Sequence, residues 1–327
     1  EILSNIVSSQ IEEHKEFGGV VPEIAARAHV EKIEFIIKKA IKESGLDLKN
    51  IDGISATAGP GLIVCLTVGL NAAKAIAGSL DKPFVAINHL EGHALSPKII
   101  KKIKFPYLLL LISGGHTQFL EVNGVNSYKR LGTTIDDALG EAFDKTAKLL
   151  GIEFPGGPKI EEWAKKGDEN YFKLPKPILK IGGCNLSFAG LKTAVLKTSK
   201  ILKNEKEKYN LAASFQKTIN EILYEKTKVA MKVFLKNKEN KNKFFVIAGG
   251  VASNLSIRNN LTEVAKEKNF TPIFPPINLC SDNAAMIAWA GIERYKINLI
   301  DDLKFSSRAR WPLDSSAPFM KGAGLKF

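Results

Sequence analysis

The sequence predicts an α/β protein in which strands alternate with helices and the sheets are flanked by helices. Short apolar runs of strand length end in glycine-rich turns, and longer segments between them repeat apolar residues at helical spacing. The composition, with 45% hydrophobic and 25% charged residues, is that of a globular protein. Since domains average about 150 residues, we expect the 327-residue chain to hold two of them.

Strands are predicted where β-branched and other apolar residues run together between turn signals. The segments are 2–7, 51–57, 84–88, 107–112, 119–122, 128–131 and 244–248, with a short extended stretch at 272–276. A loop that opens with Asn123-Gly124 joins 119–122 to 128–131, which is typical of a β-hairpin. Hairpins beside strand–helix units indicate mixed sheets.

Helices are predicted at 22–45, 63–77, 134–150 and 210–235, after residue 254, and from 281 to 295. Pro22 suits a first helical turn, Gly45 a helix end, and Ser281 the cap of the last helix. The helix at 134–150 would carry four acids on its polar side. They are Asp136, Asp137, Glu141 and Asp144, and a solvated face is the ordinary interpretation of the first three.

Charge and cysteine content limit the classes of function. The net charge of +13 and the isoelectric point of about 9.4 favour a polyanionic partner such as tRNA or DNA, although lysine-rich helix faces give the same balance. Three widely spaced cysteines form no disulfide framework, which predicts a reducing, cytoplasmic location. No apolar run reaches the roughly 18 residues of a membrane span. The abrupt, strand-like start at Glu1 leads us to expect further residues upstream.

His89 and His93 are the strongest candidate metal ligands in the sequence. They stand at positions i and i+4, so on a helix both imidazoles share a face and can bind one divalent cation. A structural pair of histidines is the alternative. The metalloprotease box is excluded because it needs glutamate after the first histidine, where this chain has Leu90.

Two glycine-rich turns, 112–117 and 249–254, each follow a buried strand. Glycines allow backbone N–H groups to converge on an anion, so the two turns together indicate a nucleotide site, although each alone is equally well a tight turn. Neither turn has the spacing of a P-loop. Cys184 and Cys280 have no basic neighbours in sequence and are predicted to be structural. No Ser–His–Asp arrangement can be assigned.

In combination these motifs resemble the TsaD family of tRNA N6-adenosine threonylcarbamoyltransferases. The matching segments run in order along nearly the whole chain. They are Phe17-Gly18-Gly19-Val20-Val21-Pro22-Glu23 with Arg27 and His29, Ala58-Gly59-Pro60-Gly61-Leu62, His89-Leu90-Glu91-Gly92-His93, Ser113-Gly114-Gly115-His116-Thr117-Gln118, 135–145, Pro155-Gly156-Gly157-Pro158, Ser187-Phe188-Ala189-Gly190-Leu191-Lys192, Gly249-Gly250-Val251-Ala252-Ser253-Asn254 and Arg310-Trp311-Pro312-Leu313.

The resemblance implies the two-lobed actin-like/sugar kinase/Hsp70 (ASKHA) fold, with a mixed sheet in each lobe. We expect an N-terminal lobe at 1–105, completed by about 299–327, and a C-terminal lobe at 106–298, with the boundary at Lys104-Phe105-Pro106. The family's first strand and phosphate loop have no counterpart in this sequence. A chain without them would lack the central strand of its first lobe.

The resemblance also implies site residues. A divalent metal, Fe(2+) or alternatively Zn(2+), would be bound by His89, His93 and Asp282. Substrate contacts would fall on Ile112, Ser113, Gly114, Gly115, His116, Asp144, Gly157 and Asn254, and Asp144 is the candidate catalytic base. We expect tRNA to be contacted by four basic residues, Lys192, Arg258, Arg308 and Arg310. The lysine-rich run at 236–243 is a weaker candidate, because it is typical of a solvated helix end.

The implied reaction is transfer of the threonylcarbamoyl group of L-threonylcarbamoyl-AMP to N6 of adenosine 37 in tRNAs that read ANN codons. The products are t6A and AMP, and the implied partners are a TsaB-like paralogue and a TsaE-like ATPase. Two alternatives remain: an ATP-dependent small-molecule kinase of the same fold, and a nonenzymatic tRNA- or DNA-binding scaffold. A kinase would give the histidine pair no obvious task.

Overall fold

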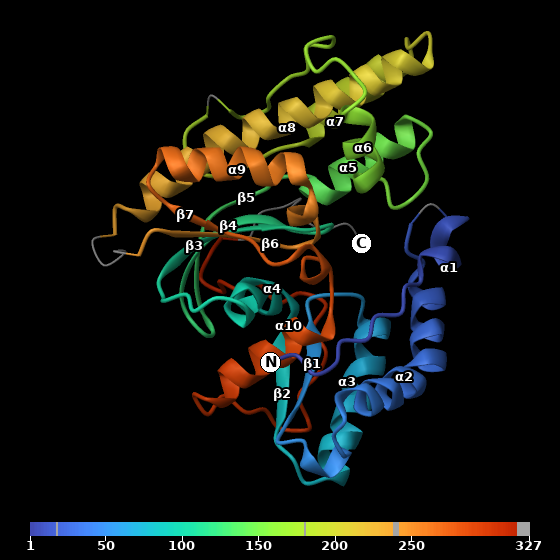
Figure 1. The fold of residues 1–327 in the computed structure, drawn as a ribbon, viewed down its shortest axis with the longest axis vertical. Helices are drawn as coiled ribbons and strands as arrows, with labels where there is room; N and C mark the ends of the chain where they lie inside the picture. Colours follow the sequence, from blue (N-terminus) through green and yellow to red (C-terminus); the bar gives the residue numbers. More distant parts are fainter. Residues whose placement is uncertain (18, 180, 238–241, 319–327) are drawn as a thin grey trace. The chain divides into compact units, whose positions relative to one another are not determined.

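The computed structural model describes the chain except residues 18, 180, 238–241 and 319–327 (Figure 1). Contacts divide it into two units. Unit 1 comprises Glu1–Lys102, Val125–Ser127 and Asp282–Ser315, and unit 2 comprises Ile103–Gly124, Tyr128–Ser281 and the chain from Ser316. The chain therefore returns to unit 1 at Asp282, whereas we expected this return at about residue 299. Part of the expected tail, 319–327, lies outside the described residues.

Unit 1 is built on two parallel strands joined by a helix. Its elements are α1 (Ile11–Lys15), α2 (Pro22–Ser44), η1 (Leu48–Asn50), β1 (Ile54–Gly59), α3 (Ile63–Ser79), β2 (Phe84–Asn88), α4 (His89–Leu95), η2 (Ser96–Ile99) and α10 (Ala284–Tyr295). Strands β1 and β2 pair in register from Ile54–Phe84 to Thr57–Ile87. Helix α3 packs on them through Leu70, and Gly45 ends α2 in the left-handed conformation.

The predicted strand at 2–7 is wrong, because residues 1–10 have no regular secondary structure. A strand needs a neighbour to satisfy its backbone N–H and C=O groups. Within the described part of unit 1, the sheet holds only β1 and β2, plus an isolated bridge between Phe84 and Asp301. The side chains of Leu3 and Val7 are accordingly 51% and 64% exposed. The expected mixed sheet is therefore not found in this unit.

Unit 2 contains a five-stranded mixed sheet in the order β5-β4-β3-β6-β7. The strands are β3 (Tyr107–Ile112), β4 (Thr117–Gly124), β5 (Ser127–Thr133), β6 (Phe244–Ala248) and β7 (Thr271–Ile273). Strand β3 is antiparallel to β4 and parallel to β6, and it is completely buried. The predicted hairpin and the apolar strands 107–112 and 244–248 are confirmed.

Helices cover one face of this sheet in Figure 1. They are α5 (Leu139–Leu149), α6 (Gly157–Ala164), α7 (Ala189–Ser199), α8 (Glu205–Phe234) and α9 (Leu255–Glu267), with the 3-10 turns η3 (Gly250–Ser253) and η4 (Ile277–Leu279). Alternate residues of β3, including Leu108 and Leu110, enter one core with Phe215 and Phe234 of α8. The period-two alternation of the strand therefore sets which side chains meet the helices.

Three helix starts differ from the prediction. Helix α5 begins at Leu139, so 134–138 is not helical, and α8 begins five residues before the expected 210. Helix α10 is capped by Asn283, whose Oδ1 accepts a hydrogen bond from the Met286 backbone N–H at 2.9 Å, and not by Ser281. Both residue types cap helices well, so the sequence alone could not choose between them.

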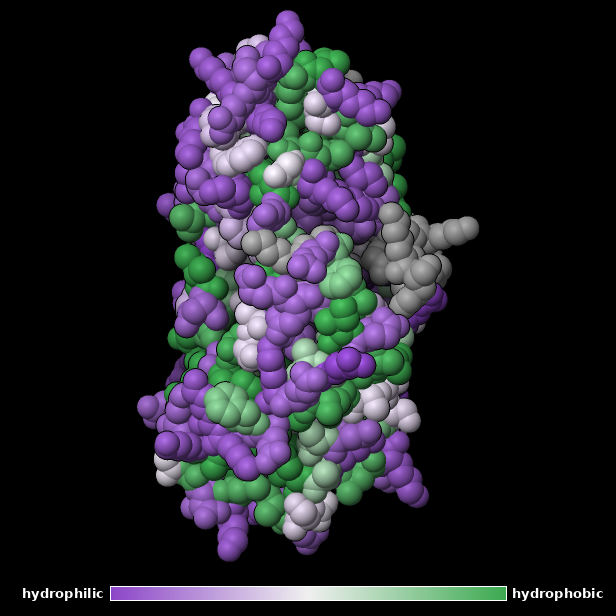
Figure 2. All heavy atoms as spheres, turned by 90° about the vertical axis from the view of Figure 1, so that its right-hand side faces the viewer, coloured by the Kyte–Doolittle hydropathy of each residue, from purple (hydrophilic) through white to green (hydrophobic). Residues whose placement is uncertain are grey.

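No described helix combines the length and the apolar character that crossing a bilayer requires. On the face drawn in Figure 2, hydrophilic side chains are interspersed with hydrophobic ones.

Candidate active site

The two histidines lie on α4, which starts directly after β2 in unit 1. Asn88 caps this helix, since its Oδ1 accepts a hydrogen bond from Leu90 N at 2.9 Å. One helical turn separates His89 from His93, and their ring centroids are 4.8 Å apart in an edge-to-face arrangement. The predicted helical spacing therefore does place both imidazoles on one face.

Asp282 joins this pair. Its Oδ1 atom lies 3.2 Å from His89 Nε2 and 3.1 Å from His93 Nε2, and one ligand atom from each residue lies within 4.8 Å of the others. Two donor atoms that bind one metal at about 2.1 Å and a right angle are about 3.0 Å apart. Each imidazole nitrogen thus lies at a distance from the Asp282 carboxylate oxygen that fits a shared transition metal.

The protonation states also suit a cation. Partial desolvation would raise the pKa of the Asp282 carboxyl, although its side chain is 76% exposed, but hydrogen bonds from both imidazoles outweigh it and hold that pKa far below its usual range. Burial lowers the pKa of His93 more than Asp282 raises it. Neutral imidazole and ionised carboxylate are the forms that ligate metals. Among the described residues, the buried His93 Nδ1 has no hydrogen-bond partner, and the ring contacts Asp282 through Nε2.

The ligand set is open on one side. His89 and Asp282 border a cavity of about 1020 Å³ that is also lined by Ser55 and Thr57 of β1 and by Gly291 of α10. An open side distinguishes sites that accept a further ligand from closed structural metal sites.

In unit 2, the turn from Ser113 to His116 follows β3. Ser113 N donates to His116 O at 2.8 Å, and His116 N donates to Ser113 Oγ at 3.1 Å, which closes the turn. A Cβ atom added to Gly114 or Gly115 would meet no atom within 4 Å. The backbone at these two glycines is therefore open to a ligand.

The start of α5 packs on this turn through a glycine that the sequence analysis missed. A Cβ on Gly140 would lie 2.8 Å from both Gly114 Cα and Ser113 O, so only glycine fits. Gly140 N donates to Ser113 O at 3.2 Å, and Leu139 N donates to Thr117 Oγ1 at 2.8 Å. A glycine inside a predicted amphipathic helix was the available signal.

The second glycine-rich turn lies against the first. Gly249 has φ +98°, and a Cβ there would lie 2.3 Å from Ile112 O, at the end of β3. Because β3 and β6 are parallel and paired from Leu108–Phe245 to Leu111–Ala248, both turns leave the same edge of the sheet. The structure thus brings these two predicted turns together.

Asn254 and Asp144 lie near these turns but are engaged with the protein itself. Asn254 Oδ1 caps α9 by accepting from Ile257 N at 2.9 Å, and its Nδ2 donates to Gln216 Oε1 at 2.9 Å. Asp144 Oδ1 accepts from Gly156 N at 2.9 Å, at the start of α6. Burial raises the pKa of Asp144, and the N–H groups of Gly156 and Gly157 only partly oppose it.

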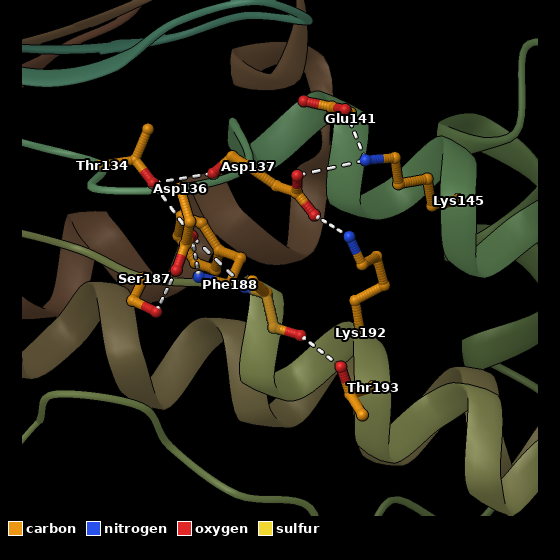
Figure 3. Close-up of polar contacts among 10 residues, drawn as sticks. Thr134, Asp136, Asp137, Glu141, Lys145, Ser187, Phe188, Lys192 and Thr193 are labelled. Carbon is orange, nitrogen blue, oxygen red and sulfur yellow. Dashed lines mark hydrogen bonds and ion pairs between the residues drawn. The ribbon is translucent and has the colours of Figure 1, made fainter. Parts of the chain in front are cut away.

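Asp136 is not on a solvated helix face, contrary to the prediction. Figure 3 shows it pointing at the start of α7. Its carboxylate accepts hydrogen bonds from Phe188 N at 2.7 Å, from Ala189 N at 3.2 Å and from the Ser187 hydroxyl. Asp136 therefore caps a helix that lies about fifty positions away in sequence, and no local pattern could show this.

Asp137 is 5% exposed and joins α5 to α7 (Figure 3). Its carboxylate oxygens lie 2.6 Å from Lys192 Nζ and 3.1 Å from Lys145 Nζ, while Lys145 also pairs with Glu141 at 2.5 Å. Although burial would raise the pKa of Asp137, the hydrogen bonds from both lysines lower it. Lys192 is consequently committed to an internal ion pair.

Arg258 is also used internally. Its Nη2 atom donates to Pro275 O at 2.7 Å and contacts Cys280 Sγ at 3.0 Å, and its guanidinium lies over the Phe274 ring. Burial raises the thiol pKa of Cys280, which suits the structural role expected for it. Of the expected tRNA contacts, Arg308 and Arg310 are exposed, while 238–241 lies outside the described residues.

Comparisons with known proteins cover most of the chain. The family model for TsaD, tRNA N6-adenosine threonylcarbamoyltransferase, matches residues 1–289. A protein of that name from Pelagibacter ubique is 67% identical over 99% of this chain and 91% of its own length. One from Rhodospirillum rubrum is 51% identical over 99% of this chain and 90% of its own length.

Solved structures bear on the fold. The crystal structure of T. kodakarensis HypF matches with a TM-score of 0.60 at 17% identity, covering 81% of this chain and 44% of that one. Full-length HypF in its phosphate- and nucleotide-bound form matches with a TM-score of 0.56 at 15% identity, covering 84% and 42%. These matches confirm the expected ASKHA fold. With family model and relatives in agreement over nearly its full length, the chain belongs to the TsaD family of tRNA N6-adenosine threonylcarbamoyltransferases.

Proposed function

We propose that this enzyme, a tRNA N6-adenosine threonylcarbamoyltransferase that forms t6A, uses L-threonylcarbamoyl-AMP as donor and adenosine 37 of ANN-reading tRNAs as acceptor. The observation that carries the site assignment is the meeting of two glycine-rich turns at one edge of the unit 2 sheet, where Gly249 packs on Ile112. Backbone amides at such an edge suit the phosphate of the AMP group.

The reaction is acyl-type transfer from a mixed anhydride. The N6 amine attacks the carbamoyl carbon, the bond from that carbon to the phosphate oxygen breaks, and AMP leaves with the electron pair. Because AMP is already a good leaving group, positioning and charge stabilisation supply most of what the protein must add. Gly114 and Gly115 would hold the phosphate side of the donor.

Asp144 is our candidate to accept the N6 proton. Burial raises its pKa, which makes it a stronger base than an ordinary aspartate. The same carboxylate holds Gly156 at the start of α6, so it would also fix Gly157, an expected substrate contact. Asn254, held by Gln216, would fix the end of the other turn.

We assign His89 and His93 through Nε2, with Asp282 through Oδ1, as ligands of one divalent metal. This donor set suits Fe(2+) and also accepts Zn(2+). A metal held by these three residues would supply Lewis-acid chemistry.

Protein partners and location complete the proposal. A TsaB-like paralogue and a TsaE-like ATPase are the partners that the family resemblance implies. The adjoining helices α2 and α3 expose apolar side chains, among them Val30, Phe35 and Val64, at 62%, 64% and 49%, which supports a protein contact there. A tRNA substrate supports a cytoplasmic location for the enzyme.

The test is an assay with purified chain, tRNA and threonylcarbamoyl-AMP, with and without the two partner proteins. We expect t6A, detected by mass spectrometry of digested tRNA, and release of one AMP per t6A. A parallel assay with ATP and candidate sugars tests the kinase alternative. Phosphorylated sugar without t6A would establish the kinase, and tRNA binding without either product would establish the scaffold.

A further inference from the structure

Glu91 lies between the two metal-ligating histidines on α4, yet its side chain points to different partners. It is 1% exposed, and its Oε2 atom lies 2.6 Å from Nη1 of Arg294 on α10. Its Oε1 atom accepts a hydrogen bond from Asn126 N at 2.8 Å. Arg294 is itself buried, with 8% of its side chain exposed.

Helices α4 and α10 are also in close contact at Gly92, the residue that follows Glu91 on α4. A Cβ on Gly92 would lie 2.9 Å from Ile287 Cδ1, so no side chain separates the two helices there. The third ligand, Asp282, lies just before α10 and is followed by the helix cap Asn283. The way α10 lies on α4 therefore sets the distance between the histidine pair and Asp282.

We propose that Glu91 and Arg294 form a positioning pair that holds α4 and α10 in the register the metal site needs. The inference rests on the metal site proposed above. Neither side chain is a ligand. Their contact fixes the two helices on which the ligands are mounted, so that Asp282 Oδ1 lies nearly equally far from both imidazoles.

Stability alone is a weak reason for this pair. Removing two charges from water costs about as much as their attraction returns, and a well-packed apolar pair is often as stable. Arg294 Nε is moreover buried and has no hydrogen-bond partner in the part of the chain that the structure describes, which adds to the cost. A directional, charge-assisted contact offers what an apolar pair cannot, which is a defined orientation of two helices.

The chain offers a matched control. Lys98, in η2 directly after α4, pairs with Glu293 of α10 at 2.8 Å, with 14% and 12% of the side chains exposed. This ion pair joins η2, the segment that continues α4, to α10 one residue from Arg294, and it does not involve the helix turn that carries the histidines. It should contribute to stability without affecting the metal.

The experiment compares two double variants of the full chain, Glu91→Gln with Arg294→Met and Lys98→Met with Glu293→Gln. Co(2+) affinity is measured by competition with a chelator, and the d–d absorption bands report the coordination geometry. We expect the first variant to bind Co(2+) about 10–100-fold more weakly, as for other partners that orient ligands, with altered bands. The second should match the wild type in both readouts, whatever its melting temperature.

Wild-type affinity and bands in the folded Glu91/Arg294 variant would overturn the positioning role while leaving the metal site intact. Equal losses in both double variants would also overturn it, because the loss would then follow general stability. A wild-type chain that binds no Co(2+) would instead defeat the metal site itself. Should the first variant not fold, Arg294→Lys replaces it: reduced affinity supports the inference and wild-type affinity overturns it.

Discussion

Asp144 shows how one carboxylate can have two tasks that a single substitution separates. Its Oδ1 accepts a hydrogen bond from Gly156 N, and burial raises its pKa. Asparagine keeps the accepting oxygen but cannot take a proton at pH 7. The Asp144→Asn variant therefore tests the proton transfer while sparing the start of α6.

We expect Asp144→Asn to lower kcat by about 10²–10⁴-fold if Asp144 is the general base. A base works only when deprotonated, so the wild-type rate should fall as pH drops through the pKa of Asp144. Since that pKa is raised, the fall in rate should occur at a higher pH than for an ordinary aspartate. The Asp144→Asn variant should show no such fall. Near-normal kcat with an unchanged pH–rate profile would restrict Asp144 to holding Gly156.

Single residues also mark the limit of the sequence analysis. His89 and His93 could be identified as candidate ligands because both lie within one helical turn, where spacing determines proximity. Asp282 came only from the family resemblance, since 189 positions separate it from His93. Glu91 and Arg294 were missed for the same reason, because a buried ion pair between distant helices leaves no local pattern.

At the scale of elements, Asp137 is the charged residue that ties α5 to α7. Hydrogen bonds from Lys192 and Lys145 hold its folded-state pKa below the unfolded value, against the effect of burial. A lowered folded pKa contributes stability that is present above the unfolded pKa of about 3.9 and is lost as pH falls through the folded value.

The Asp137→Asn variant should therefore be less stable than the wild type at neutral pH, and the difference should shrink as the pH falls below about 4. Urea unfolding at several pH values measures this. Glu162→Gln is the matched control, because Glu162 pairs with Lys159 and Lys166 on the surface and should cost little at any pH. If Asp137→Asn lowered the free energy of unfolding by the same amount at every pH, the loss would come from altered packing and not from the missing charge.

Elements were predictable where their own residues decide them. The strand 84–88 and the helix from Pro22 to Gly45 carry their signals locally, and both are confirmed. The segment 2–7 has an equally strand-like sequence but no neighbouring strand in the described unit 1, so it forms none. The segment 134–138 reads as helical, but its aspartates bind residues from 187 to 192 instead.

At the scale of the whole molecule, the charge of +13 predicts a salt-dependent encounter with tRNA. Each neutralised phosphate releases condensed counterions, so about four contacts imply a log–log slope of roughly −3 to −4. Of the basic residues expected to contact tRNA, Arg258 and Lys192 already pair within the protein, whereas Arg308 and Arg310 are exposed. The guanidinium of Arg308 is stacked on Phe305 and Trp311 at 4.6 and 4.8 Å.

We expect Arg308→Gln to reduce the slope by about one without affecting the binding of threonylcarbamoyl-AMP. Arg258→Gln, matched in chemistry, should leave the slope unchanged, since its guanidinium is bound to Pro275 and Cys280. Filter binding of tRNA between low and physiological salt measures both. If the affinity of the wild type is flat over that range, the positive charge reflects composition alone, and tRNA docking must depend on the partner proteins.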